Sequence, residues 1–268
     1  MTADPGRAAF LRELCGRQED LLVWKHLDRS LEGRGDLDAA APRRCLPGIV
    51  ADARLLARDG LQASIMICCE HVADKQLLFF VRPKLLPQLF EFDVCTGPSR
   101  GLAPWADPHD MLDLAVLDDG IRRLRPGAEA IVSIVYHGLS ALGNDRLRGD
   151  ERDIVRRGLD RDLDGALAAC RTLPPIEARA SLVRLIRRVS EGSWSRRDAA
   201  AAWFGFAMTG PRHPGFTGRR IAFRWRIATG RDCVMGRLAR RHDRQVSADG
   251  LADVLRVARL DGHEVVSL

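Results

Sequence analysis

Two aspartates with one residue between them, Asp36 and Asp38, form the pattern in this sequence with the clearest chemical potential. They open an apolar run, so in an extended chain both carboxylates project from the same face. Two like charges held this close repel each other, and a divalent cation is the usual physical reason for keeping them at the edge of a core. The alternative is a Gly-Arg-Gly-Asp turn whose aspartates simply lie in water. The pair alone favours neither interpretation.

A third carboxylate, Asp93, lies in the otherwise apolar run QLFEFDVC. If that run is a strand beside the first one, the three aspartates can bind two Mg²⁺ ions, which hold a triphosphate and neutralise charge during attack on its α-phosphorus. Asp93 is also suited to take the proton of the attacking hydroxyl. The segment before Asp36 offers cations and small residues for the β- and γ-phosphates, namely Lys25, His26, Ser30, Gly33, Arg34 and Gly35.

The elements that must position these residues can be predicted from hydrophobic spacing. Apolar residues at helical intervals predict helices over residues 5–16 and 42–60. Apolar runs bounded by turn residues predict strands over 21–24, 36–41, 62–72, 76–81 and 88–95, with a polar loop over 26–35. Short connections between the last three strands favour an antiparallel meander. A mixed sheet of about five strands covered by helices is therefore expected.

The second half of the chain has a different pattern. Helical spacing predicts helices over 126–142, 148–170, 175–189 and 194–208, followed by an Arg-rich segment over 219–241. The whole is an α+β protein, with a sheet-bearing domain over residues 1–125 and a mostly helical domain over 126–268.

The composition indicates which partners and which cellular compartment to expect. The 268 residues carry a net charge of +6 and a pI of about 9.2, which favours acidic partners such as nucleotide phosphates, nucleic acid or anionic lipid. The seven cysteines include no CxxC pair and are typical of reduced thiols in a cytoplasmic protein. The N-terminus has no signal-peptide pattern, and no apolar run reaches the length of roughly 18 residues that a membrane helix requires.

Taken together, these residues resemble the nucleotidyltransferase superfamily typified by DNA polymerase beta, and in particular its minimal bacterial members. The resemblance covers about residues 20 to 145 and rests on Trp24-Lys25-His26, on residues 33–38 (GRGDLD) and on Phe92-Asp93-Val94. The predicted helix over 126–142 matches the helix after the third-aspartate strand in those proteins. Lys25 and His26 stand where the family most often has Gly-Ser, so the serine's phosphate contact would fall to the imidazole, to Ser30 or to backbone amides.

The resemblance implies transfer of a nucleoside monophosphate from an NTP to a hydroxyl-type acceptor, with release of pyrophosphate. Asp36 and Asp38 would then bind Mg²⁺, with Asp93 as metal ligand and base. A small molecule or sugar is the favoured acceptor, and an RNA end or a protein hydroxyl is possible. Two alternatives stay open: a regulatory protein that binds a nucleotide without chemistry, and an RNA-binding protein that uses the Arg-rich segment. The favoured interpretation of that segment is a solvated helix face paired with the acids of residues 148–164.

Overall fold

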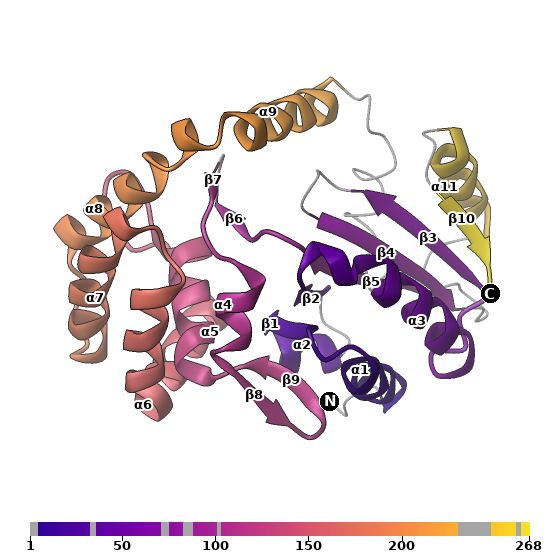
Figure 1. The fold of residues 1–268 in the computed structure, drawn as a ribbon, viewed down its shortest axis with the longest axis horizontal. Helices are drawn as coiled ribbons and strands as arrows, with labels where there is room; N and C mark the ends of the chain where they lie inside the picture. The colour runs from indigo at the N-terminus through magenta and orange to yellow at the C-terminus, as the bar shows by residue number, and fades with distance from the viewer. Residues whose placement is uncertain are drawn as a thin grey trace. The chain divides into compact units, whose positions relative to one another are not determined.

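The computed structural model describes residues 5–32, 36–70, 75–82, 88–100, 103–229, 248–260 and 264–268. The chain forms two compact units (Figure 1). The first unit comprises Met1–Thr96, Leu117–Arg122 and Arg219–Leu268. The second unit comprises Gly97–Val116 and Arg123–Gly218. The division at residue 125 that the sequence suggested stays a prediction.

A mixed β-sheet forms the framework of the first unit, and the predicted α+β class is confirmed. Among the described residues the sheet has eight strands in the order β10-β3-β4-β5-β2-β1-β9-β8. Their bounds are β1 Leu22–Lys25, β2 Leu37–Ala40, β3 Ile65–Glu70, β4 Lys75–Arg82, β5 Gln88–Cys95, β8 Ala115–Asp118, β9 Ile121–Leu124 and β10 Glu264–Ser267. Strands β2 and β5 run parallel, whereas β3, β4 and β5 form the predicted antiparallel meander.

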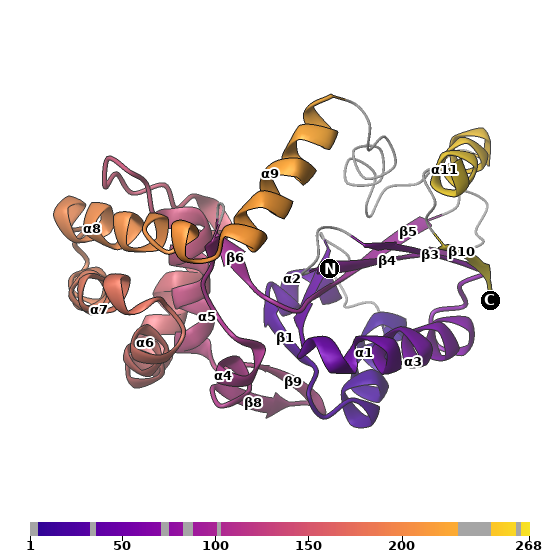
Figure 2. The ribbon, with the colours of Figure 1, turned by 45° about the horizontal axis from the view of Figure 1, so that its top comes forward.

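Helices cover both faces of this sheet (Figure 2). On one face, α1 (Pro5–Arg17) and α3 (Leu46–Asp59) form a core with alternate strand residues. On the other face, α11 (Ala248–Leu260) contributes to a smaller core over β3 and β4. The run LLFFV in β4 is continuously apolar because Leu78 and Phe80 belong to the first core, while Phe79 and Val81 belong to the second.

The structure corrects several predicted elements. The segment expected as a polar loop over 26–35 contains a short helix, α2 (Leu27–Leu31). The helix expected over 126–142 is shorter, because α5 (Pro126–Ser133) passes into a π-helical turn at Ile134–Gly138. The turn is held by Arg100, whose guanidinium donates hydrogen bonds to the carbonyls of Val135 and Leu139. Arg100 thereby binds carbonyl groups at the point where a longer helix would continue.

The second unit is mostly helical. Its elements are β6 Ser99–Arg100, β7 Ala103–Pro104, α4 Pro108–Leu112, α5, α6 Gly149–Thr172, α7 Ile176–Ser190 and α8 Arg196–Ala207. Helix α8 approaches α7 closely at Gly205, where an added Cβ would lie 2.7 Å from the backbone nitrogen of Ala178. Helix α9 (Pro214–Ala228) follows and ends in residues assigned to the first unit. The predicted helices of this half are thus present, with shifted ends.

Asp162 joins α5 to α6 within the second unit. Its carboxylate accepts hydrogen bonds from Arg125 and from the backbone nitrogens of Gly127 and Gly165, at a kink inside α6. Burial alone would raise the pKa of Asp162, but these hydrogen bonds and the nearby guanidinium hold it below its ordinary value.

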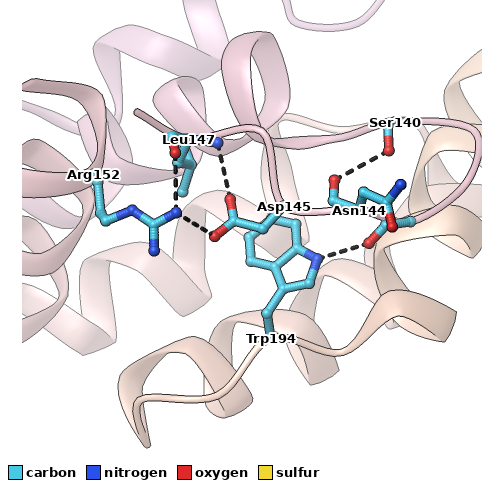
Figure 3. A network of polar contacts seen from close by, with 7 residues as sticks. Ser140, Asn144, Asp145, Leu147, Arg152 and Trp194 are labelled. Atoms are coloured by element: carbon cyan, nitrogen blue, oxygen red, sulfur yellow. Dashed lines mark hydrogen bonds and ion pairs between the residues drawn. The ribbon is translucent and has the colours of Figure 1, made fainter. Parts of the chain in front are cut away.

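A network of polar contacts fixes the loop between the π-helical turn and α6 (Figure 3). The Trp194 indole donates to the carbonyl of Gly143, and the Ser140 hydroxyl donates to the carbonyl of Asn144. Asp145 accepts from the backbone of Leu147 and from Arg152. Loops held by several side-chain contacts are ordered parts of a fold and not loose connectors.

Two sequence expectations concern the cellular setting. Six cysteines are free thiols, namely Cys15, Cys45, Cys68, Cys69, Cys95 and Cys170, and Cys233 lies outside the described residues. Burial raises the pKa of Cys170 to about 12. Of the helices within the described ranges, none combines the length and apolar character that crossing a membrane requires.

Candidate active site

The pairing of β2 with β5 places two aspartates opposite each other. In this parallel pair Asp38 faces Asp93, and Leu37 faces Phe92. The side chains of Leu37 and Phe92 enter the core beneath α1 and α3. Because strand residues alternate between faces, Asp38 and Asp93 project from the other face of the sheet.

Asp36 completes the cluster from just before β2, two residues from Asp38. One carboxylate oxygen from each of the three aspartates lies within 4.8 Å of the others. Asp38 and Asp93 are each 1% exposed, and Asp36 is partly exposed. The structure therefore brings together the three carboxylates that the sequence singled out, in a setting where their mutual repulsion is weakly screened by water.

Lys25 supplies a positive charge to this cluster. It stands opposite Asp38 across the antiparallel pair β1–β2, beside an irregularity in the strand at Trp24. The Lys25 ammonium lies 2.9 Å from a carboxylate oxygen of Asp38 and is 17% exposed. It also lies 5.3 Å from the centre of the Trp24 ring, within the range of a cation–π contact. A predicted phosphate-binding cation thus contacts one of the predicted metal ligands.

The backbone at Asp36 is anchored from α2. The Ser30 hydroxyl donates a 2.5 Å hydrogen bond to the carbonyl of Asp36. The Ser30 carbonyl in turn accepts a 3.0 Å hydrogen bond from the guanidinium of Arg7, which is 1% exposed and lies over the Phe90 ring at 4.5 Å. This chain of contacts links a buried arginine of α1 to the segment that carries the first aspartate.

Arg7 and its role were missed at the sequence level, although a signal existed. Arg7, Phe10, Leu11 and Leu14 stand at i, i+3, i+4 and i+7, so helical spacing places Arg7 on the face that contacts the core. A buried guanidinium needs hydrogen-bond acceptors, and the nearest polar segment of the site provides one.

The remaining predicted nucleotide-binding residues are placed only in part. His26 adopts a left-handed backbone conformation with φ of 60° directly before α2. Gly33, Arg34 and Gly35 lie outside the described residues. The roles predicted for these residues and for Ser30 stay predictions.

The donor set suits a hard divalent cation. Carboxylate oxygens are the ligands that Mg²⁺ and Ca²⁺ prefer, and Mg²⁺ is commonly bound by one or two carboxylates together with substrate phosphates. Three aspartates on one face of a sheet, with a lysine and, among the residues that the structure describes, no cysteine or histidine in the cluster, match that preference. The site can therefore hold a metal ion.

Comparison with known proteins adds little to this geometry. The sequence matches no family model and no curated protein. A distant structural likeness exists to JHP933 from Helicobacter pylori, with a TM-score of 0.39 and 8% identity over 82% of this chain and 95% of that one. A second crystal structure, described as a "putative nucleotidyltransferase" from H. pylori, has a TM-score of 0.33 and 8% identity over 77% of this chain and 92% of that one. Likeness at this level establishes neither a shared fold nor a shared activity.

Proposed function

We propose that this protein is a Mg²⁺-dependent nucleotidyltransferase that moves a nucleoside monophosphate from an NTP to a hydroxyl group. The observation that carries the proposal is the convergence of Asp36, Asp38 and Asp93 within 4.8 Å on one face of the sheet. Two Mg²⁺ ions fit the proposal, with the three aspartates as their protein ligands. Three carboxylates held this close repel each other, and a bound divalent cation would offset that repulsion.

The proposed chemistry assigns each residue a task. Asp36, Asp38 and Asp93 would hold Mg²⁺, which would supply positive charge to the triphosphate and to the leaving pyrophosphate. Asp93 accepts the proton of the acceptor hydroxyl, whose oxygen forms a bond to the α-phosphorus. The bond from the α-phosphorus to the oxygen that bridges to the β-phosphate breaks, and pyrophosphate departs with that electron pair.

Lys25 has two successive roles in this proposal. Without metal its ammonium offsets the charge of Asp38, which it contacts at 2.9 Å. With metal and nucleotide bound, Lys25 turns to the triphosphate, as a flexible four-carbon side chain permits. Arg34 adds positive charge, and the His26 imidazole and the backbone amides around Gly33 and Gly35 add donors to the β- and γ-phosphates. Because the Ser30 hydroxyl bonds the Asp36 carbonyl, Ser30 contributes mainly by holding the loop.

The proposal extends to the two domains, the acceptor and the cellular location. The sheet over residues 1–125 would be a nucleotidyltransferase-like domain, and the helical part over 126–268 would shape the acceptor pocket. A small hydroxyl-bearing molecule is the proposed acceptor, and the cytoplasm, where NTP and Mg²⁺ are abundant, is the proposed location.

The test combines nucleotide binding with turnover. Thermal unfolding would be measured with ATP, CTP, GTP and UTP, each with and without MgCl₂, and pyrophosphate release would be followed with the NTP that stabilises the protein. A ligand at 100 times its dissociation constant stabilises the folded state by about 2.7 kcal/mol. We expect Mg²⁺-dependent stabilisation by at least one NTP, lost in Asp38→Asn and Asp93→Asn.

Asp59→Asn is the matched control, since Asp59 is an exposed acid at the end of α3, away from the cluster. If no NTP stabilises the wild-type protein, the proposal is wrong. It is also wrong if Asp59→Asn loses as much of the NTP-dependent stabilisation as Asp38→Asn and Asp93→Asn lose. Stabilisation without pyrophosphate release would indicate the non-catalytic nucleotide-binding alternative.

A further inference from the structure

Helix α9 carries several exposed arginines. Its sequence, PGFTGRRIAFRWRIA, contains four arginines and no acid. Arg219, Arg224 and Arg226 are exposed, and within the described part of the chain none of them contacts a carboxylate. Some exposed arginines elsewhere do pair with acids, as Arg58 does with Asp59 and Arg188 with Glu191, whereas Arg157 and Arg187 have no such contact among the described residues.

Two large apolar side chains are exposed on the same helix. Ile221 is 52% exposed and Trp225 is 67% exposed, and the two stand one helical turn apart. Phe223, by contrast, is buried and lies beneath Arg226 at 5.8 Å from its ring centre. The outward face of α9 thus combines a flat aromatic ring with a neighbouring aliphatic side chain.

The arrangement of these residues indicates what they bind. At 100° per residue, Arg224 lies about 80° from the middle of the Ile221–Trp225 pair on one side, and Arg226 and Arg219 lie about 120° to 140° from it on the other. Helices that lie in a membrane surface present a broad apolar face, whereas here the exposed apolar pair is narrow and the long arginine side chains can reach around it from both sides. Bases stack on exposed aromatic rings, and guanidinium groups bind phosphates bidentately and stack on bases.

We propose that the outward face of α9 binds single-stranded nucleic acid. Trp225, with Ile221 beside it, stacks on a base, and Arg219, Arg224 and Arg226 contact the flanking phosphates. This inference goes beyond the proposed transfer reaction and does not depend on it, because no residue of the aspartate cluster takes part.

Binding would be measured by fluorescence anisotropy with the full chain and a labelled single-stranded RNA of about 12 nucleotides, within the usual span of such sites. Unlabelled DNA of the same sequence and vesicles of anionic lipid serve as competitors. We expect Trp225→Ala to weaken binding by about tenfold, as loss of one stacking contact does. The double variant Arg224→Ala/Arg226→Ala should also weaken binding and should lower the slope of log affinity against log salt by about 1.4.

The matched control is Arg58→Ala/Arg188→Ala, which removes the same charge from two exposed arginines that have acidic partners. It should leave affinity within about twofold of wild type, since the general charge of the protein contributes little at a defined site. Asp38→Asn should bind RNA as the wild type does, which separates failure of this proposal from failure of the proposed reaction. Circular dichroism checks that each variant is folded.

The proposal would be overturned if the two double variants lost equal RNA affinity, or if Trp225→Ala bound RNA as tightly as the wild type does. Displacement of RNA by anionic vesicles at concentrations where DNA has no effect would overturn it in favour of a membrane surface. Competition by DNA as well as RNA supports it and shows that the 2′-hydroxyl is not read.

Discussion

Asp38 of β2 and Asp93 of β5 lie directly opposite each other in a parallel strand pair, and each is 1% exposed. Two buried carboxylates at neighbouring positions destabilise the fold unless a cation offsets their charge. Lys25 supplies a positive charge to Asp38. A divalent ion would add further positive charge to the three acids of the cluster and would stabilise the fold.

Asp93→Asn should separate stability from function. The substitution keeps the shape of the side chain and removes one negative charge, so in the presence of a chelator the variant should be about 1 kcal/mol more stable than wild type. Addition of MgCl₂ should then stabilise the wild type and leave the variant unchanged. Urea unfolding with EDTA and with MgCl₂ measures both effects. A variant less stable than wild type in EDTA and equally responsive to Mg²⁺ would contradict this account.

Lys25→Met should change metal affinity and stability in opposite directions. Loss of the ammonium leaves Asp38 without its contact at 2.9 Å, so the metal-free protein should lose about 1 kcal/mol. The same loss removes a charge that competes with the metal, so Mn²⁺ affinity should rise severalfold. Calorimetric titration with Mn²⁺ and unfolding in EDTA would test the two effects, with Arg58→Met as an exposed cation control. Weaker Mn²⁺ binding would show that Lys25 does not compete for the site.

Arg7→Met should destabilise the fold and weaken metal binding at the aspartate cluster. The substitution leaves the buried carbonyl of Ser30 without the guanidinium that donates to it, which costs about 2 kcal/mol. Mn²⁺ affinity should also fall, because Ser30 holds the backbone of Asp36. Arg12→Met on the same helix is the control: it breaks an exposed ion pair with Asp119 and should cost less than about 1 kcal/mol. If Arg7→Met and Arg12→Met lose equal amounts of stability and of Mn²⁺ affinity, Arg7 has no special role at the site.

Asp162 should make the second unit sensitive to acid. Its folded-state pKa lies below its ordinary value of 3.8, so its contribution to stability is fully present above that value and is lost as pH falls through the lower folded-state pKa. Asp162→Asn should be less stable than wild type at pH 7, and the difference should shrink as pH falls below 4. Thermal unfolding between pH 7 and pH 2.5 would measure it. A stability difference between wild type and Asp162→Asn that grows as pH falls would contradict the lowered pKa of Asp162.

Much of the aspartate cluster was accessible from the sequence because it depends on alternation. The run at Asp36–Ala41 and the run QLFEFDVC each place apolar and acidic residues on opposite faces, and a shared core face forces the acids together. The sequence could not supply the register, since a shift by one residue would separate Asp38 from Asp93.

Other features of the fold and the site could not be predicted from the sequence, because they depend on contacts between segments that lie far apart in the chain. The short strand β10 lies beside β3, some 195 residues earlier in the chain, and its four residues carry little pattern of their own. The end of α5 is set by Arg100, a residue outside that helix. Lys25 was expected on the phosphates, and its contact with Asp38 required the β1–β2 register, which a strand irregularity alters.

Direct binding of a divalent ion is the measurement closest to the central claim. Mn²⁺ would be titrated into metal-free protein and followed by electron paramagnetic resonance, with Mg²⁺ as competitor, in wild type, Asp38→Asn and Asp59→Asn. The account predicts that wild type and Asp59→Asn bind Mn²⁺ and release it to Mg²⁺, whereas Asp38→Asn does not bind. Equal binding by wild type and Asp38→Asn, or no binding by either, would contradict the claim that the three aspartates form a metal site.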